Sequence, residues 1–413
     1  MERCISIARM SEPEVMSSAN VAEITPTDSF TVYDTFDSMD LSEDILRGVY
    51  GVGFEKPSAI QQRGIVPIKE GRDILAQAQS GTGKTGTFVT GSLTRVDPSL
   101  KQIQVLILAP VRELAQQIHD VAVQISKYMN NKEGINVYCA TGGSPLRDDI
   151  RAIERGCQFL VGTPGRIYDL MNRNVLKRAH IKVLVMDEAD QMLEDRFKEQ
   201  VLCILEKGFP STTQVALFSA TMDKEVVDVA NTMLRKPVRI LVDAKEVPLH
   251  GIKQLYVELE MESWKFDVLS DLYSQLTISQ ALVYVNERKK AELLAEKMTQ
   301  QGFPLSVIHG EMDVNERKKR MAEFRAGEVR VMISTDMLAR GIDVQQVSLV
   351  INYELPLDRE NYIHRIGRAG RFGRKGVTIN LIAPEDKRAK EEIEKHWSIN
   401  MQLLPSDLSS VMN

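Results

Sequence analysis

The chain has 413 residues and a formal net charge of -5, with 43% hydrophobic and 26% charged residues. This length exceeds what one hydrophobic core usually supports, so we expect two domains. The composition is that of a soluble globular protein and excludes a mostly disordered chain. Because the overall charge is acidic, charge alone argues mildly against a nucleic acid as partner. Any site for a nucleic acid would have to be formed by a local group of residues.

The four cysteines are scattered without a C-x-x-C pair, so neither a zinc site nor a disulfide framework is indicated, and a reducing compartment fits best. Charged residues interrupt the first ten positions, and the longest apolar runs have the length of strands. We therefore expect neither a signal peptide nor a membrane span. Residues 1–35 show no helical or strand period, which predicts a flexible tail.

From residue 36 onward, short apolar runs alternate with longer helical patterns, which is typical of βα units around a parallel sheet. In the first half, the runs that predict strands are Asp73–Ala76, Val105–Ala109, Asn136–Ala140, Phe159–Val161, Val183–Met186 and Val215–Phe218. In the second half they are Lys253–Leu259, Ala281–Val285, Leu305–Ile308, Val329–Ile333, Leu349–Asn352 and Val377–Ile382. Residues 242–250 carry turn formers without a period, so we expect a short linker between α/β domains 36–241 and 251–413.

The strongest single signal is a Gly-rich string between a predicted strand and a helical segment. Small residues there let backbone N–H groups surround phosphates at a helix N-terminus, while Lys84 neutralises charge and the Thr85 hydroxyl suits Mg²⁺. Ala78 replaces the first Gly of the general pattern, and a chance Gly-rich turn is the alternative. The string predicts a nucleotide site made of Ser80, Gly81, Thr82, Gly83, Lys84 and Thr85.

A second signal lies where the apolar run 182–186 meets Asp187-Glu188-Ala189-Asp190. Ligands of doubly wound sheets bind at the carboxyl ends of the strands. We therefore expect Asp187 to hold Mg²⁺ and Glu188 to orient or deprotonate the water that attacks the γ-phosphate. The alternative is an acidic helix N-terminus, which the helix dipole favours.

These four residues also spell the name of the DEAD-box ATP-dependent RNA helicases, and the chain from about residue 36 to its end resembles that family. The resemblance implies two tandem RecA-like domains that bind ATP and Mg²⁺ in a cleft and RNA across both lobes. Residues 53–61 resemble the family's adenine-recognition motif, which implies ATP contacts from Phe54, Lys56 and Gln61. The Phe54 ring can stack on the base, and the Gln61 amide offers both a donor and an acceptor.

Three further strings are similar to family motifs. Ser219-Ala220-Thr221 resembles the motif that couples the nucleotide state to domain closure, with a simple helix cap as the alternative. The strings 339–343 and 364–371 belong to the second domain. By the resemblance, they imply that catalysis requires the cleft between the two domains to close. In that resemblance Gly341 and Asp343 contact the nucleotide, and Arg368 and Arg371 are arginine fingers.

The RNA contacts that the resemblance implies lie mostly where a strand meets a helix. Backbone N–H groups at such places bind phosphates without a basic protein, although an ordinary turn is the alternative for any single string. Contacts to the backbone and the 2′-OH imply little sequence preference. The implied residues are Pro110, Arg112, Glu113, Gly142, Gly143, Thr163, Pro164, Gly165, Arg166, Asn286, Arg288, Thr335 and Asp336.

Three positions depart from the family pattern. Val111 and Glu287 stand where a Thr is expected, and Val314 stands where a Gln is expected. All three lie in or near RNA-binding motifs, so a lost hydrogen bond or an added carboxylate would weaken RNA binding rather than ATP chemistry.

Within the family, the residues 77–80, the compact length and the ending 404–407 resemble the branch that acts in translation initiation. That resemblance implies a cytoplasmic monomer and a scaffold protein that bridges the lobes. The exon-junction branch, a nuclear ATP-locked RNA clamp, shares almost the same core and is the first alternative. The second is a P-loop ATPase that acts on DNA or protein, against which Gln61 and Ala78 argue.

Overall fold

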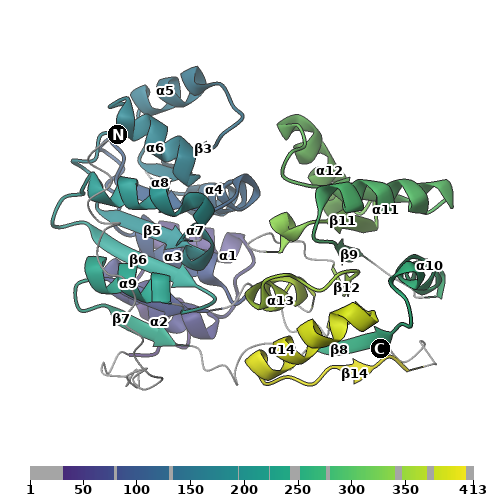
Figure 1. Cartoon of the computed structure of the whole chain (residues 1–413). Coiled ribbons are helices and arrows are strands. Elements are labelled where there is room, and N and C mark those ends of the chain that lie inside the picture. The colour runs from purple at the N-terminus through teal and green to yellow at the C-terminus, as the bar shows by residue number, and fades with distance from the viewer. Residues whose placement is uncertain are drawn as a thin grey trace, which may run out of the picture.

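The computed structural model describes residues 31–78, 81–129, 134–193, 195–222, 224–241, 252–275, 280–339, 347–369 and 376–405. These residues form two lobes, each built around a parallel sheet of seven strands (Figure 1). The predicted α/β fold with two parallel sheets flanked by helices is therefore confirmed. None of the helices described in these ranges is long and apolar enough to cross a lipid bilayer.

The first lobe has the strand order β3-β4-β2-β5-β6-β1-β7. Its strands are β1 (Ile74–Gln77), β2 (Val105–Leu108), β3 (Val137–Ala140), β4 (Phe159–Gly162), β5 (Val183–Asp187), β6 (Gln214–Ser219) and β7 (Val238–Leu241). Its helical segments are η1 (Asp37–Met39), α1 (Glu43–Gly51), α2 (Ala59–Lys69), α3 (Lys84–Leu93), α4 (Arg112–Ser126), α5 (Leu146–Glu154), α6 (Pro164–Asn172), α7 (Ala189–Leu193), α8 (Asp195–Glu206) and α9 (Lys224–Met233).

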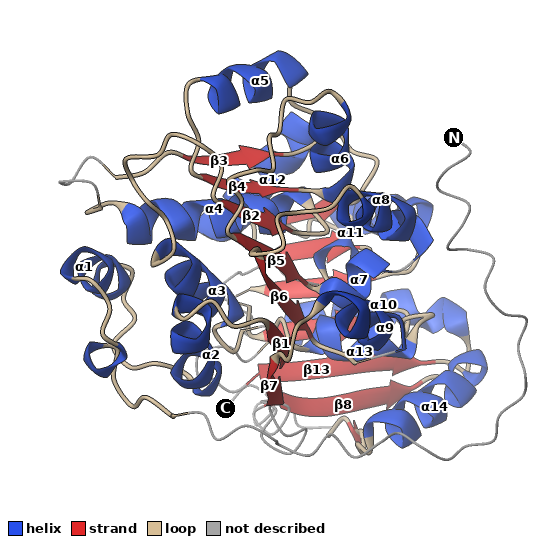
Figure 2. Cartoon of the chain, turned by 90° about the vertical axis from the view of Figure 1, so that its left-hand side faces the viewer, coloured by secondary structure: helices blue, strands red, loops and turns tan. Residues whose placement is uncertain are grey.

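Side chains alternate between the two faces of this sheet, as the pleat of a strand requires. Val105 and Ile107 of β2 belong to the core beneath α1 to α4, whereas Leu106 and Leu108 belong to the core beneath α6 to α9. Figure 2 shows these two groups of helices on opposite sides of the sheet. Both faces are covered, which explains why the strands are continuous apolar runs.

The second lobe repeats the architecture with the order β10-β11-β9-β12-β13-β8-β14. Its strands are β8 (Ile252–Glu258), β9 (Ala281–Tyr284), β10 (Leu305–Ile308), β11 (Val331–Ser334), β12 (Leu349–Asn352), β13 (Gly376–Ile382) and β14 (Gln402–Leu403). Its helical segments are η3 (Glu262–Trp264), α10 (Lys265–Gln275), α11 (Arg288–Gln300), α12 (Val314–Ala326), η4 (Asp336–Leu338), α13 (Arg359–Ile366), η5 (Pro384–Asp386) and α14 (Lys387–Trp397).

The predicted strands all occur, with ends that differ by one or two residues. The sequence patterns missed β7 and β14, which are short and lie at the edges of their sheets beside β1 and β8. The predicted linker 242–250 and residues 1–30 of the predicted tail lie outside the described residues. Tyr33 packs against the first core, and its N–H donates to the carbonyl oxygen of Gln62 at 3.3 Å.

A buried carboxylate ties together the end of the first sheet opposite the carboxyl ends of its strands. Asp73, 3% exposed, accepts from the N–H of Val215 at 2.9 Å and from the N–H of Arg235 at 2.7 Å. Asp73→Ala would leave both N–H groups without this acceptor, so we expect a loss of about 2 to 5 kcal/mol in the free energy of unfolding.

Urea unfolding followed by circular dichroism measures this loss. Tryptophan fluorescence would not report on the first lobe, because both tryptophans, Trp264 and Trp397, lie in the second lobe. Asp73→Asn is the matched control, since its amide oxygen still satisfies one N–H and the loss should be smaller. Equal stability of Asp73→Ala and the wild type would contradict the assigned role.

Candidate functional site

The phosphate loop and the acidic turn after β5 meet in the interior of the first lobe. Lys84 is the first residue of α3, and its side chain is 5% exposed. Its ammonium nitrogen lies 2.9 Å from Glu188 Oε1 and 3.8 Å from Asp187 Oδ1. The structure thus brings together three residues that the sequence predicted for nucleotide chemistry. Gly81 and Thr82 form the turn before α3, whereas Ser80 lies outside the described residues.

Electrostatics in this cluster are dominated by burial and by the lysine. Burial raises the pKa of Asp187 to about 7. Burial also opposes ionisation of Glu188, but the charge and hydrogen bond of Lys84, together with the nearby His364, lower the pKa of that carboxyl. The Lys84 ammonium is itself disfavoured by burial, yet the carboxylates raise its pKa. The site therefore holds charge only because opposite charges compensate each other.

Backbone strain shapes the turn that presents these carboxylates. Glu188 has φ 53°, in the left-handed region that a non-Gly residue rarely adopts. Its N–H donates to Asp187 Oδ1 at 3.0 Å, which supports the turn. Strained backbone of this kind is found mostly where function requires a particular geometry.

Mg²⁺ fits the oxygen donors available here. Asp187 supplies a carboxylate, and Thr85 supplies a hydroxyl one residue after Lys84. Within the described residues no group of three His, Cys, Asp or Glu side chains could hold a metal ion. This matches the way proteins usually hold Mg²⁺ with nucleotides, by one or two carboxylates together with phosphate oxygens and water.

The predicted adenine-recognition residues lie directly against the first turn of α3. A Cβ on Gly86 would be 2.5 Å from Gln61 Nε2 and 2.8 Å from Phe54 Cε2, so only glycine leaves room for both side chains. The N–H of Ser58 donates to Gln61 Oε1 at 2.8 Å, which orients the amide. Lys56 lies on the same segment and is exposed.

Asp190 connects the acidic turn to β6 and to the second lobe. Its N–H donates to Ser219 Oγ at 3.3 Å, and Thr221 Oγ1 donates to its carboxylate at 3.2 Å. The buried His364 of α13 places Nε2 3.6 Å from the same carboxylate. The predicted coupling motif and the second lobe therefore meet at one side chain.

Arg368 is 2% exposed, and its Nε donates to the carbonyl oxygen of His364 at 3.2 Å. This places Arg368 just beyond the C-terminal end of α13, close to the residue that contacts the first lobe. The other residues of the second domain predicted to bind the nucleotide, Gly341, Asp343 and Arg371, lie outside the described residues.

A cavity of about 720 Å³ lies between the lobes, and most of the predicted RNA contacts line it. Those lining residues are Pro110, Arg112, Glu113, Gly142, Thr163, Gly165, Arg166, Asn286, Thr335 and Asp336. Gly143 and Pro164 are sequence neighbours of lining residues. Arg288 forms ion pairs with Glu311 and, at 4.0 Å, with Glu292.

The cavity lining carries three arginines, Arg112, Arg166 and Arg317, alongside three acidic residues, Glu113, Asp169 and Asp336. Burial, followed by the nearby Arg317 guanidinium, lowers the pKa of Arg112, and Arg166 acts in the same direction. Arg166 is held in place by an ion pair with the fully buried Asp149 and by a bond from Nη2 to the carbonyl oxygen of Ser144 at 2.8 Å. Three crowded guanidinium groups favour an anionic ligand such as a phosphate backbone.

Sequence patterns missed several residues of the cavity wall, among them Phe197, Gln200, Arg317 and Asn361. Arg317 lies in a highly charged segment of α12 that resembles a solvated helix face. In the structure its Nη2 is instead 2.6 Å from Glu113 Oε1 of the other lobe, and both side chains are largely buried. Sequence carries no signal for this pair because its members are 204 residues apart.

The three departures from the family pattern occupy helix starts. Val111 and Glu287 are the N-cap residues of α4 and α11, and neither side chain makes a capping hydrogen bond. Val314 begins α12, and its Cγ2 would be 2.5 Å from a Cβ on Gly143 of the first lobe. Val314 therefore contacts the opposite lobe through apolar atoms.

Comparison with known proteins places the chain in a family. Residues 58–229 match the family described as DEAD/DEAH box helicase, and residues 264–373 match the family described as helicase conserved C-terminal domain. The chain belongs to the DEAD-box helicases, as its sequence motifs predicted.

Relatives of nearly the same length support this assignment. The chain is 50% identical over 400 residues to the ATP-dependent RNA helicase eIF4A of Emericella nidulans, covering 97% of both chains. It is 48% identical over 405 residues to eukaryotic initiation factor 4A of Caenorhabditis elegans, covering 97% of this chain and all of the relative.

Solved structures of relatives superpose on this chain to different degrees. S. cerevisiae Dbp5 bound to RNA and ADP BeF3 superposes with a TM-score of 0.84 at 36% identity, covering 91% of this chain and 97% of that chain. A DEAD box protein from Methanococcus jannaschii, 33% identical, gives 0.54 while covering 91% of this chain and 100% of that chain. The high score across both lobes means that they are placed here much as in the RNA-bound Dbp5 chain.

Val111→Thr tests the first departure. The new hydroxyl would lie at the cavity and at the start of α4, where it can bind an RNA phosphate or cap the helix. We expect RNA affinity to rise about two- to tenfold, the value of one neutral hydrogen bond. Fluorescence anisotropy with labelled single-stranded RNA measures this change.

Val111→Ala is the control, since it removes the same apolar contact without adding a hydroxyl. RNA affinity of Val111→Thr equal to or below that of the wild type would show that the departure does not weaken RNA binding.

Proposed function

We propose that this protein is an ATP-dependent RNA helicase that binds RNA across both lobes and separates short duplexes locally during translation initiation. One observation carries the proposal: the same pair of lobes encloses the Lys84 and Glu188 cluster, joined to His364 through Asp190, and the arginine-rich cavity. The names of the relatives support the initiation branch and do not favour the exon-junction clamp.

In the proposed reaction the first lobe holds ATP. The Ser80 to Thr85 loop surrounds the phosphates with backbone N–H groups, while Phe54, Lys56 and Gln61 recognise the adenine. Thr85 and Asp187 would hold Mg²⁺, which when bound neutralises charge on the phosphates. Glu188 accepts a proton from the attacking water, because the neighbouring Lys84 favours the ionised form of this carboxyl, and only that form can take up a proton.

The second lobe completes the site when the cleft is closed. Arg368 and Arg371 stabilise the charge that spreads over the transferring phosphoryl group, and Gly341 and Asp343 contact the nucleotide. Lys84 assists from the first lobe. Hydrolysis then depends on both lobes, and the Asp190 to His364 contact supports their apposition.

RNA binds in the proposed cavity through its phosphates. Arg112, Arg166 and the helix start at Thr163 bind successive groups of one strand, and Asn286 lines the cavity from the second lobe. Because ATP and RNA both favour the closed lobes, each tightens the binding of the other, and hydrolysis releases the strand.

Further features of the proposal rest on the resemblance to the initiation branch. We propose a cytoplasmic monomer whose lobes, residues 36–241 and 251–413 joined by the linker 242–250, are bridged by a scaffold protein. The closed arrangement leaves each lobe a separate outer surface for such a partner (Figure 1).

Comparison of ATP turnover with single-stranded RNA and with DNA of the same sequence tests the function. We expect strong stimulation by RNA and little by DNA, together with ATP-dependent separation of a short RNA duplex. Equal stimulation by both polymers would favour an ATPase that acts on DNA, and the absence of stimulation by either would contradict a nucleic-acid partner.

Glu188→Gln tests the catalytic assignment. The amide keeps the shape of the side chain but cannot take the proton of the water, so ATP hydrolysis should fall by about 10²- to 10⁴-fold. ATP and RNA binding should persist, as measured by equilibrium titration. Glu199→Gln, at an exposed position of α8, is the control; near wild-type turnover of Glu188→Gln would refute the role of Glu188.

A further inference from the structure

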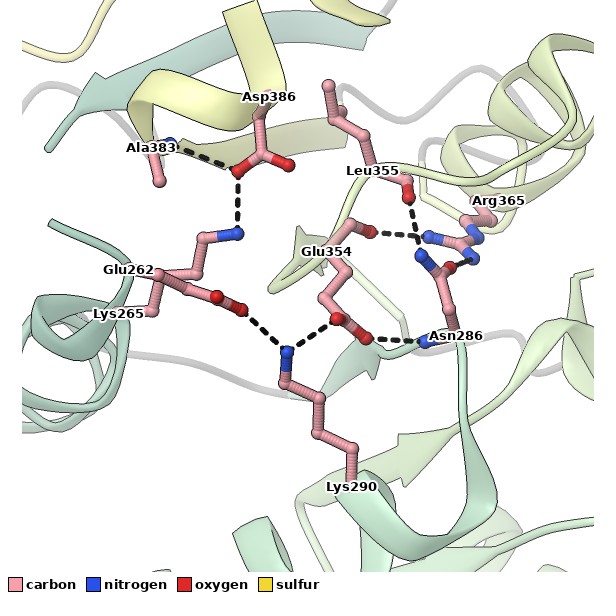
Figure 3. Close-up of polar contacts among 9 residues, drawn as sticks. All are labelled: Glu262, Lys265, Asn286, Lys290, Glu354, Leu355, Arg365, Ala383 and Asp386. Carbon is pink, nitrogen blue, oxygen red and sulfur yellow. Dashed lines mark hydrogen bonds and ion pairs between the residues drawn. The ribbon is translucent and has the colours of Figure 1, made fainter.

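A chain of polar contacts crosses the second lobe from its outer surface toward the cavity (Figure 3). Glu262 of η3, with a side chain 48% exposed, places Oε1 2.7 Å from Lys290 Nζ. The same ammonium lies 2.5 Å from Oε1 of Glu354, whose side chain is only 17% exposed. Burial disfavours the charged lysine, but the two carboxylates raise its pKa. Glu354 is therefore the inner member of a triad of alternating charge.

Glu354 sets the position of Asn286 in the cavity wall. Its Oε2 accepts from the N–H of Asn286 at 2.7 Å. The Asn286 side chain is also fully engaged, because Nδ2 donates to the carbonyl oxygen of Leu355 at 2.9 Å and Oδ1 accepts from Arg365 Nη2 at 2.8 Å. Asn286 therefore lines the cavity in an orientation that these three partners determine.

Arg365 carries the chain of contacts into α13. It is fully buried and donates from Nη1 to the carbonyl oxygen of Glu354 at 2.7 Å, while its Nε lies 2.5 Å from Oδ1 of Asp336, another residue of the cavity wall. The preceding residue, His364, contacts Asp190 in the first lobe. One turn of helix thus joins the RNA wall to the ATP cleft.

We propose that Glu354 is a positioning residue that couples RNA binding to the ATP cleft. Its carboxylate holds Asn286 in the wall, and the Asn286 side chain in turn accepts from Arg365 of α13, so that RNA on the wall and His364 in the cleft are ordered together. This inference rests on the proposed function.

The chemistry of the carboxylate explains why this position needs an acid. Its two oxygens accept from the Asn286 N–H and from the Lys290 ammonium at the same time. An amide could accept from only one of them and would turn an NH₂ group toward the other donor. Lys290 would keep its ion pair with Glu262 in either variant. Glu354→Gln should therefore have a smaller effect than Glu354→Leu, which loses the bonds to both Asn286 and Lys290.

A second ion pair in the same lobe supplies the matched control. Lys265 and Asp386 are 2.6 Å apart with side chains 2% and 19% exposed, and neither contacts Asn286 or Arg365 in Figure 3. Asp386→Asn should lower the thermal stability of the lobe without changing communication between the two ligands. It separates a general loss of packing from a loss of coupling.

The experiment measures RNA affinity of the full-length variants with and without a non-hydrolysable ATP analogue, along with RNA stimulation of ATP hydrolysis. The analogue should increase the RNA affinity of the wild type. In Glu354→Leu we expect this increase to be smaller by about two- to thirtyfold, which is the range of effects found for residues that transmit coupling. Glu354→Gln and Lys290→Met should shift the same ratio in the same direction by less, and Asp386→Asn should leave it unchanged.

The proposal would be overturned if Glu354→Leu left the ratio of RNA affinities with and without the analogue unchanged. An equal loss of RNA affinity in both conditions is such a result and would mark a purely structural role. Should Glu354→Leu fail to fold, Glu354→Gln decides by the same ratio. A wild-type protein in which the analogue leaves RNA affinity unaltered would instead contradict the proposed function.

Discussion

The ATP cleft depends on a buried ammonium placed between two carboxylates. Lys84 compensates Glu188 and Asp187 in an interior where an unpaired charge would cost several kcal/mol, roughly the penalty for each ion taken from water. The pair draws the first turn of α3 toward the end of β5, so that phosphate loop and acidic turn are already adjacent without a ligand. Bound phosphates would compete with the carboxylates for the lysine, and Asp187 would be one of the residues that hold Mg²⁺.

Two polar contacts join the lobes on either side of this arrangement. Asp190 to His364 lies beside the ATP cluster, and Glu113 to Arg317 lies at the RNA cavity. Small polar interfaces of this kind normally permit relative movement of domains. The contacts therefore suit a protein whose lobes close when ligands are present and separate when they leave.

The RNA cavity reconciles an acidic chain with an anionic partner. Guanidinium groups of Arg112, Arg166 and Arg317 crowd one cavity, and buried acids hold two of them in position. Net charge describes long-range attraction, whereas binding depends on the local arrangement of donors. The part of the cavity wall that the second lobe supplies is organised differently. There the side chains of Asn286 and Asp336 both accept hydrogen bonds from Arg365. These side chains, and the Asn286 N–H that donates to Glu354, serve to order the wall.

Much of the fold followed from local pattern. Buried parallel strands are continuous apolar runs, so their number and order along the chain were apparent except for the edge strands β7 and β14, which are defined only by pairing with β1 and β8. The phosphate loop and the acidic turn were equally apparent, because each is a contiguous string whose chemistry depends on its place at a strand end.

What the sequence by itself determined about this protein is therefore its family, its two α/β lobes and the strings that bear ATP and RNA chemistry. Only the tertiary structure decided which of those side chains remain available. Glu113 is paired with Arg317, Asp190 is shared between β6 and α13, and Glu354, which no motif included, holds Asn286 in the cavity wall. The physical reason is that charge pairing acts through space, between groups that the fold brings together from distant parts of the chain, and a local pattern carries no record of such partners.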